Sequence, residues 1–116
     1  MDIRKFLRSF VYAFQGILEA VKEQNMRFHV ASACIVIVAG LLTGLSVIEW
    51  LIIVLVIILV IGAEMMNCAI ERVVDLATSE IHPLAKAAKD AAAGAVLVFA
   101  IGSVIIGVLI FFPKWF

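Results

Sequence analysis

The architecture of this chain follows from residues 50–75, which read WLIIVLVIILVIGAEMMNCAIERVVD. The first part, Trp50–Ala63, contains no charged residue, whereas the second part contains three carboxylates and one arginine. A transmembrane helix needs about 20 predominantly apolar residues. This run therefore reaches the length of a bilayer only if its helix carries Glu64 and Asn67 into the membrane or against it. We predict such a helix over about residues 50–74.

Two longer uncharged stretches, Val30–Ile48 and Ala91–Pro113, reach the length of a transmembrane helix without including any charged residue. The whole chain is 66% hydrophobic and 16% charged, and soluble domains contain only about 45–50% apolar residues. A soluble globular domain is therefore excluded. We predict an all-α integral membrane protein of one domain, residues 1–116, with further helices over about residues 29–48 and 84–112. Pro83 is well placed as the first residue of the last helix, because its missing N–H costs nothing there.

The segment before the first span predicts an amphipathic helix over residues 1–24. Apolar residues recur at steps of three and four, at Ile3, Leu7, Phe10, Phe14, Ile17 and Val21. The opposite face carries Arg4, Lys5, Arg8, Tyr12, Gln15, Glu19 and Glu23. A helix of this kind lies in the headgroup plane and does not cross the bilayer. It is either a lipid anchor alone, or an anchor whose polar face also lines a site.

The distribution of basic residues predicts the orientation. Eight of the nine Lys and Arg residues lie before the first span or between the second and third, and only Lys114 follows the third. The positive-inside rule therefore places the N-terminus in the cytoplasm and the C-terminus outside. Trp50, Trp115 and the Phe111–Phe112 pair then fall at the outer interface, where aromatic residues are enriched. No cleavable signal peptide is expected, because charges occur throughout the first 29 residues.

Polar residues form a ladder on the predicted second span, at Glu64, Asn67, Cys68, Glu71 and Asp75. At about 100° per residue these positions fall on one face of the helix. Glu64 is the deepest, and an ionisable residue at membrane depth costs about 2.5–3.5 kcal/mol on insertion scales. A neutral acid buried between helices is the simple alternative, but several polar groups in register favour a functional site.

The predicted cytoplasmic loop and the start of the last helix add Glu80, His82, Lys86, Lys89 and Asp90. Lys86 and Asp90 are four residues apart, so a simple surface ion pair explains these two. Glu23 and Glu71, with a nearby lysine, are suited to a Mg²⁺–phosphate group. Mg²⁺ favours one or two carboxylates plus phosphate oxygens, and lysine supplies a point charge to the phosphate.

Other functional classes find little support in the sequence. The formal net charge is zero, so nothing indicates nucleic-acid binding. The common soluble nucleotide-binding motifs are absent. His29 and His82 have no zinc-site spacing to Cys34 or Cys68, and both cysteines are expected to be reduced packing residues. The Gly40–Gly44 pair indicates close helix packing in the first span.

Residues 64–75, EMMNCAIERVVD, are followed by EIHPLAK at residues 80–86 and by AKDAAAGAV at residues 88–96. This pattern closely resembles the bacterial membrane diacylglycerol kinase family, and the resemblance covers essentially the whole chain. The amino-acid sequence of the last two segments is more similar to the Gram-positive branch, whose members act as undecaprenol kinases. The resemblance implies a homotrimer with shared active sites. It also implies transfer of the γ-phosphoryl group of MgATP to a membrane lipid alcohol at the cytoplasmic face of the bacterial inner membrane.

The resemblance also implies roles for individual residues. Glu64 matches the catalytic base, Asn67 a conserved active-site amide, and Glu23 and Glu71 the metal-coordinating carboxylates. The positions that contact the nucleotide correspond to Tyr12, Glu23, Glu71, Glu80, His82, Lys89 and Asp90. The chain departs from the family at Lys5, where the charge is kept but the bidentate fork of arginine is lost. Lys5 is therefore left out of the predicted site.

Several functions remain open at this point. Undecaprenol is the preferred lipid substrate, and diacylglycerol, giving phosphatidic acid, is the alternative. A small proton-coupled transporter would explain the intramembrane carboxylate Glu64, but it would leave the cytoplasmic charged residues unexplained. A structural or regulatory membrane subunit predicts tolerance of substitution at Glu23, Glu71 and Lys89.

Overall fold

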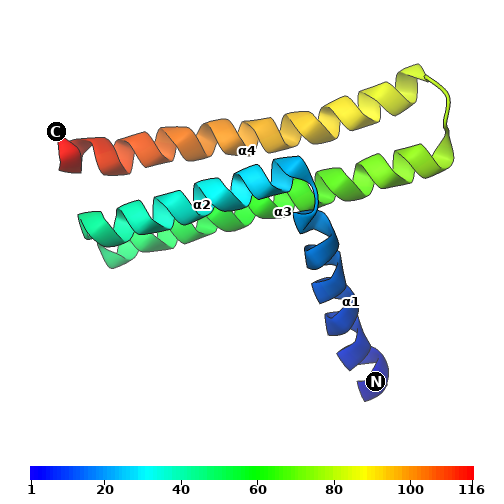
Figure 1. The fold of residues 1–116 in the computed structure, drawn as a ribbon, viewed down its shortest axis with the longest axis horizontal. Helices are drawn as coiled ribbons and strands as arrows, with labels where there is room; N and C mark the ends of the chain where they lie inside the picture. Colours follow the sequence, from blue (N-terminus) through cyan, green and yellow to red (C-terminus); the bar gives the residue numbers. More distant parts are fainter.

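The computed structural model describes residues 1–116 and contains four α-helices and no β-strand. The helices are α1 (Ile3–Val21), α2 (Gln24–Thr43), α3 (Val47–Ala77) and α4 (Pro83–Trp115). α2, α3 and α4 run alongside one another, and α1 projects away from them near the start of α2 (Figure 1). α2, α3 and α4 are each long and apolar enough to cross a membrane. The prediction of an all-α integral membrane protein with three candidate spans is confirmed.

The boundary between the first two spans differs from the predicted one. The prediction carried the first span to Ile48, but α2 ends at Thr43. Gly44 follows with φ 80°, a left-handed conformation that glycine adopts without steric cost. Ser46 then starts α3 through a reciprocal capping box with Glu49. The uncharged run crosses this turn because neither Gly44 nor Ser46 carries a charge. α2 also starts earlier than predicted, at Gln24, and α3 continues to Ala77.

Gly40 and Gly44 have different roles. Gly40 is buried, and a Cβ atom at this position would lie 2.7 Å from Cη2 of Trp50 on α3. Gly44 lies in the turn, where its N–H donates to the Gly40 carbonyl. Gly40 therefore leaves room for the Trp50 ring, as the predicted close packing requires. Gly44 ends α2 and takes no part in that packing.

We expect Gly40→Ala to lower the thermal stability of the protein in detergent. The added methyl group would collide with the Trp50 ring, and overpacking of this kind costs about 1–3 kcal/mol. Gly62→Ala is the matched control, because no atom lies within 4 Å of a Cβ at Gly62 and alanine is the better helix former. Melting curves of both variants test the packing. If Gly40→Ala and Gly62→Ala melted at the same temperature, the close contact between Gly40 and Trp50 would be contradicted.

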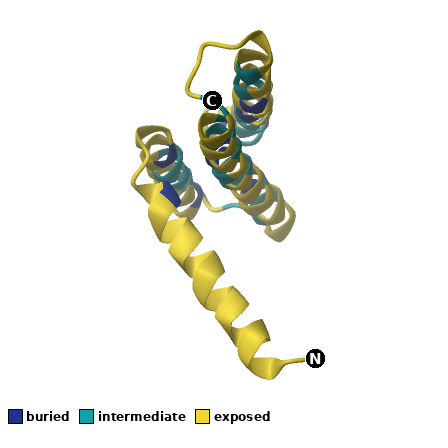
Figure 2. Cartoon of the chain, turned by 90° about the vertical axis from the view of Figure 1, so that its right-hand side faces the viewer, coloured by how far each residue is buried: buried dark blue, intermediate teal, exposed yellow.

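The buried core is small for a chain of this length. Only 11 of 116 residues are buried, and α1 contributes Ala20 alone (Figure 2). The radius of gyration is 17.4 Å, whereas a compact domain of 100 residues has about 13 Å. Most apolar side chains therefore lie on outward faces, as expected of helices whose surroundings are lipid.

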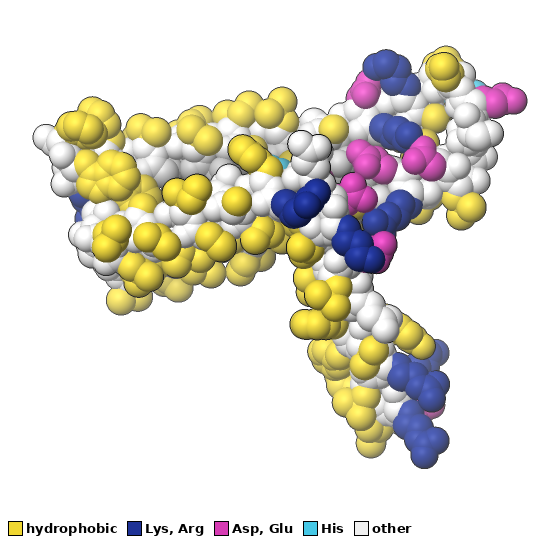
Figure 3. Space-filling view, viewed as in Figure 1, with side chains coloured by type: hydrophobic (Ala, Val, Ile, Leu, Met, Phe, Trp, Pro, Cys, Tyr) yellow, Lys and Arg dark blue, Asp and Glu magenta, His cyan; other side chains and the backbone are white.

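The two ends of the helix bundle have different chemistry. At one end, Trp115 Nε1 donates to Thr43 Oγ1 at 2.9 Å, and Lys114 pairs with Glu49 at 3.0 Å. At the other end, His82 caps α4 by accepting the Leu84 N–H on Nδ1, and Pro83 is the first residue of α4 as predicted. Charged side chains gather at this second end and along one side of α1 (Figure 3). Of the charged residues predicted for the site, Glu80, Lys89 and Asp90 lie at this second end, Glu23 lies at the junction of α1 and α2, and Glu64 and Glu71 lie further along α3.

Candidate active site

Glu64 is the deepest of the polar side chains on α3, and it faces the start of α2. Its side chain is buried, with a relative exposure of 3%. Cys68 Sγ donates to Glu64 Oε1 at 3.8 Å, and His29 Nε2 lies 3.7 Å from Oε2. The ladder on α3 therefore points inward at its deepest position, towards a histidine from the neighbouring helix.

The next residues of the ladder continue the same face. Asn67 is buried, and its Nδ2 donates to Glu71 Oε1 at 3.3 Å. The carboxylate of Glu23, between α1 and α2, lies 3.5 Å from Nη2 of Arg72. Cys68 is buried beside Glu64 on the same face. We call Glu23, Glu64, Asn67, Cys68 and Glu71 the inner cluster.

The inner cluster has the donor chemistry that Mg²⁺ prefers. Asn67 Oδ1 is buried and has no hydrogen-bond partner, and Glu71 lies beside the same amide. No group of three or more His, Cys, Asp or Glu side chains is arranged to hold a metal by itself. Mg²⁺ does not require such a group, because it binds through one or two carboxylates, waters and substrate phosphates. The residues present therefore fit a Mg²⁺ ion that arrives with a phosphate.

A second polar group surrounds a cavity of about 530 Å³ between the end of α3, the loop and the start of α4. We call it the loop cluster, and its charged and imidazole members are Asp75, Glu80, His82, Lys86, Lys89 and Asp90. Lys89 pairs with Asp75 across the two helices, and Lys86 pairs with Asp90 along α4. The second pair is the simple i,i+4 contact that the sequence had left open.

Glu19 adds a negative charge near the end of α1, four residues before Glu23. A hydrogen bond from Lys22 and its positive charge lower the pKa of the Glu19 carboxyl, and the charge of Arg72 contributes. Glu19 therefore stays ionised at neutral pH. Lys22 and Arg72 offset part of the negative charge of this region.

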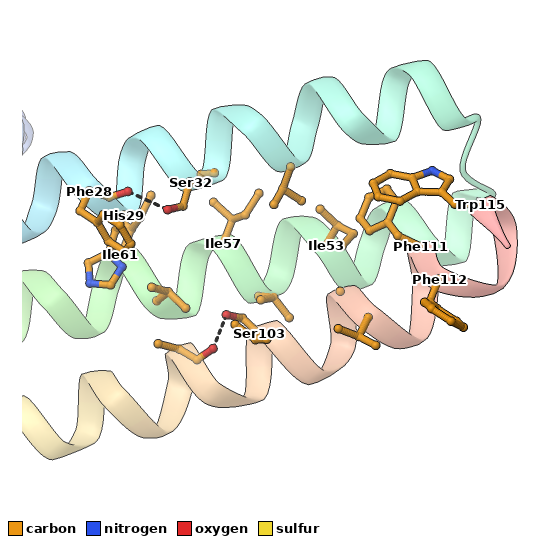
Figure 4. A pocket seen from close by; sticks show the side chains of 18 of the residues that line it. Phe28, His29, Ser32, Ile53, Ile57, Ile61, Ser103, Phe111, Phe112 and Trp115 are labelled. Carbon is orange, nitrogen blue, oxygen red and sulfur yellow. Dashed lines mark hydrogen bonds between the residues drawn. The ribbon is translucent and has the colours of Figure 1, made fainter.

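An apolar groove leads away from the inner cluster along the membrane-spanning helices. It has a volume of about 560 Å³ between α2, α3 and α4, and it extends from Phe28 and His29 to Trp115 (Figure 4). The hydroxyls of Ser32 and Ser103 donate to carbonyls of their own helices, at 2.9 and 2.7 Å. The groove walls therefore suit a hydrocarbon chain, with polar chemistry at the His29 end.

The structure groups most predicted site residues and separates one. Glu23, Glu64, Asn67 and Glu71 fall in the inner cluster, and Glu80, His82, Lys89 and Asp90 in the loop cluster. Tyr12 lies on α1, is 65% exposed and makes no side-chain hydrogen bond. Sequence reasoning missed His29 and Arg72 as partners of site carboxylates. The sequence feature that could have revealed His29 is its position at the start of the first apolar run, at about the same membrane depth as Glu64.

Three candidate spans, a buried carboxylate and two charged clusters at one end define a membrane-embedded protein that works where hydrocarbon meets water. Comparison with known proteins makes this class specific. Residues 11–111 match the family described as prokaryotic diacylglycerol kinase. The chain belongs to this family and is a lipid kinase. A kinase takes its phosphoryl group from a nucleotide, so one substrate arrives from water and the other from the membrane.

Individual relatives support the family and its Gram-positive branch. The chain is 55% identical over 114 residues to the undecaprenol kinase of Bacillus subtilis, covering 97% of this chain and 93% of that protein. It is 43% identical to a diacylglycerol kinase of Synechocystis, over 92% of this chain and 62% of that protein. A diacylglycerol kinase of Haemophilus influenzae is 32% identical, over 91% and 92% of the two chains.

Proposed function

We propose that this protein transfers the γ-phosphoryl group of ATP to undecaprenol, giving undecaprenyl phosphate and ADP. The observation that carries the proposal is the position of Glu64. Its buried carboxylate lies between an apolar groove and the oxygen-rich inner cluster, and it contacts a residue that lines the groove. The 55% identity to a protein named undecaprenol kinase supports this lipid over diacylglycerol.

In the proposed reaction the hydroxyl oxygen of the lipid attacks the γ-phosphorus of ATP. Its proton passes to the Glu64 carboxylate, the new oxygen–phosphorus bond forms, and the bond from the γ-phosphorus to the β–γ bridging oxygen breaks. The bridging oxygen leaves with ADP. Glu64 is suited to this step because it is the only carboxylate of the inner cluster that is fully buried beside the groove. General-base catalysis of this kind contributes about 10²–10⁴-fold to a rate.

The other site residues bind and orient the nucleotide. Glu23 and Glu71 would hold Mg²⁺, which supplies positive charge to the phosphates when bound, and the Asn67 amide would orient the same group. Lys89 would add a positive charge for the phosphates from the loop cluster, where it pairs with Asp75. The remaining proposed nucleotide contacts are Tyr12, Glu80, His82 and Asp90. Phosphoryl transfer depends mainly on such positioning and charge stabilisation.

We also propose that the active unit is a homotrimer with sites shared between subunits. Within one chain Tyr12 is exposed and belongs to neither cluster, so a site that includes it needs a neighbouring copy. α1 buries only Ala20, and its basic and apolar side chains lie on opposite sides (Figure 3). These features support a helix that lies at the membrane surface and completes the site of another subunit.

The proposed location is the bacterial cytoplasmic membrane, with the N-terminus inside and the C-terminus outside. Both polar clusters lie at the end of the bundle that carries most of the charged residues (Figure 3). The opposite end has Lys114 as its basic residue, paired with Glu49. The positive-inside rule then places the clusters in the cytoplasm, where ATP is available.

A two-lipid assay tests the substrate. Purified protein receives γ-labelled ATP, Mg²⁺ and equal amounts of undecaprenol and diacylglycerol in the same detergent micelles, and the labelled lipids are separated. We expect undecaprenyl phosphate as the main labelled product, because beyond His29 the groove is lined mostly by apolar side chains and both of its serine hydroxyls are already bound to carbonyls, which leaves little to match a glycerol ester. If phosphatidic acid were the main product, diacylglycerol would replace undecaprenol as the proposed substrate. Heat-denatured protein is the control.

A further inference from the structure

The Glu64 carboxylate contacts two polar side chains, one on each oxygen. Cys68 approaches Oε1 from one turn further along α3, and a thiol is a weak hydrogen-bond donor. His29 approaches Oε2 from α2, and an imidazole donates more strongly and can carry a positive charge. His29 is therefore the stronger of the two partners and the one that comes from another helix.

The His29 ring is held in a defined place. Its side chain is only 13% exposed, and the ring packs against Phe28 with centroids 5.8 Å apart and an interplanar angle of 73°. The same ring lines the polar end of the groove (Figure 4). His29 therefore touches both the groove, where the lipid is proposed to lie, and the base.

We propose that His29 is the positioning residue of the base: its Nε2–H fixes Glu64 Oε2 towards the lipid hydroxyl. This role rests on the proposed kinase function. The separation of 3.7 Å is longer than a hydrogen bond, as is common for catalytic hydrogen bonds before substrate binds. Lipid binding beside the ring is expected to shorten it.

Few other polar groups surround the pair. From α3, Glu64 contacts His29, and Cys68 contacts the same carboxylate on its other oxygen. From α4, the groove is lined by apolar side chains and by Ser103, whose hydroxyl is bound to Ala100. From α2, the neighbouring groove residues are Phe28 and Ser32. Loss of the imidazole would therefore leave Glu64 Oε2 without the polar contact that positions it.

The test compares His29→Leu and His29→Gln with the wild type in the γ-labelled ATP assay, as kcat and as KM for MgATP and for the lipid. We expect His29→Leu to lower kcat about 10- to 100-fold, the range for a lost hydrogen bond to a charged group, with KM for MgATP unchanged. His29→Gln keeps an N–H donor at this position. It should recover most of kcat. Cys34→Ala, an exposed position on α2, is the control for substitution on this helix.

Each result has a distinct meaning. A His29→Leu protein with wild-type kcat overturns the positioning role and leaves the kinase function intact. A loss confined to KM for the lipid also overturns it, because His29 then serves only as groove wall. If His29→Leu does not fold, His29→Gln decides, and a kcat more than about 10-fold below the wild type overturns the role, because an N–H donor is then present without effect. A wild-type protein that labels no lipid overturns the proposed function first.

Discussion

Glu64→Gln is expected to lower kcat by about 10²–10⁴-fold, the range that a positioned general base contributes. Glutamine has nearly the same shape as glutamate but accepts no proton from the lipid hydroxyl. The side chain is buried against His29 and Cys68, and a neutral amide is cheaper to bury there than a carboxylate. The variant should therefore fold and assemble as the wild type does. The measurement is label transfer from ATP, with gel filtration as the check on assembly.

Glu49→Gln is the matched control for this substitution. It makes the same change on the same helix, at the end of α3 where Glu49 pairs with Lys114. We expect its kcat to remain within about twofold of the wild type, because Glu49 is remote from both clusters. The change weakens a partly exposed ion pair with Lys114, and glutamine can still complete the capping box with Ser46. Near-normal turnover by Glu64→Gln would remove Glu64 from the role of base.

Glu71→Gln is expected to lower activity at least about 10²-fold at ordinary Mg²⁺ concentrations. A metal ion that neutralises phosphate charge supplies several kcal/mol of transition-state stabilisation, and each 1.36 kcal/mol corresponds to tenfold in rate. Glutamine keeps an oxygen ligand beside Asn67 but loses the negative charge. The Mg²⁺ concentration for half-maximal activity should therefore rise as well, and the measurement is a Mg²⁺ titration at saturating ATP.

The control for Glu71 is Glu19→Gln, which removes a carboxylate near the inner cluster that binds Lys22. It should leave the Mg²⁺ titration where it was. An unchanged half-maximal Mg²⁺ concentration in Glu71→Gln, with activity retained, would exclude Glu71 as a metal ligand. The orphaned Asn67 Oδ1 would then need another partner.

Most of the fold can be predicted from the sequence because membrane helices are long and their composition is extreme. The three candidate spans follow from uncharged runs, and the start of α4 follows from Pro83. The boundary near Gly44 cannot be located in this way. There the hydrophobic pattern continues without interruption, while the backbone is turned by a left-handed glycine and a capping box.

The candidate site is predictable where it lies on one helix. Glu64, Asn67 and Glu71 share a face of α3 because of the 3.6-residue period, and the structure buries the first two. Contacts between helices are different, because hydropathy contains no information about them. The His29–Glu64 and Arg72–Glu23 contacts depend on how α1 and α2 cross α3. The place of Tyr12 in the site is harder still to predict, because its proposed partners belong to another subunit.

The central claim is that the inner cluster transfers phosphate from a nucleotide to a membrane lipid. The most direct test is the two-lipid assay run in parallel with γ-labelled and α-labelled ATP on the wild-type protein. The account predicts labelled undecaprenyl phosphate with γ-labelled ATP and no labelled lipid with α-labelled ATP, in a reaction that requires Mg²⁺. Folded, assembled protein that labels neither lipid from γ-labelled ATP would contradict it.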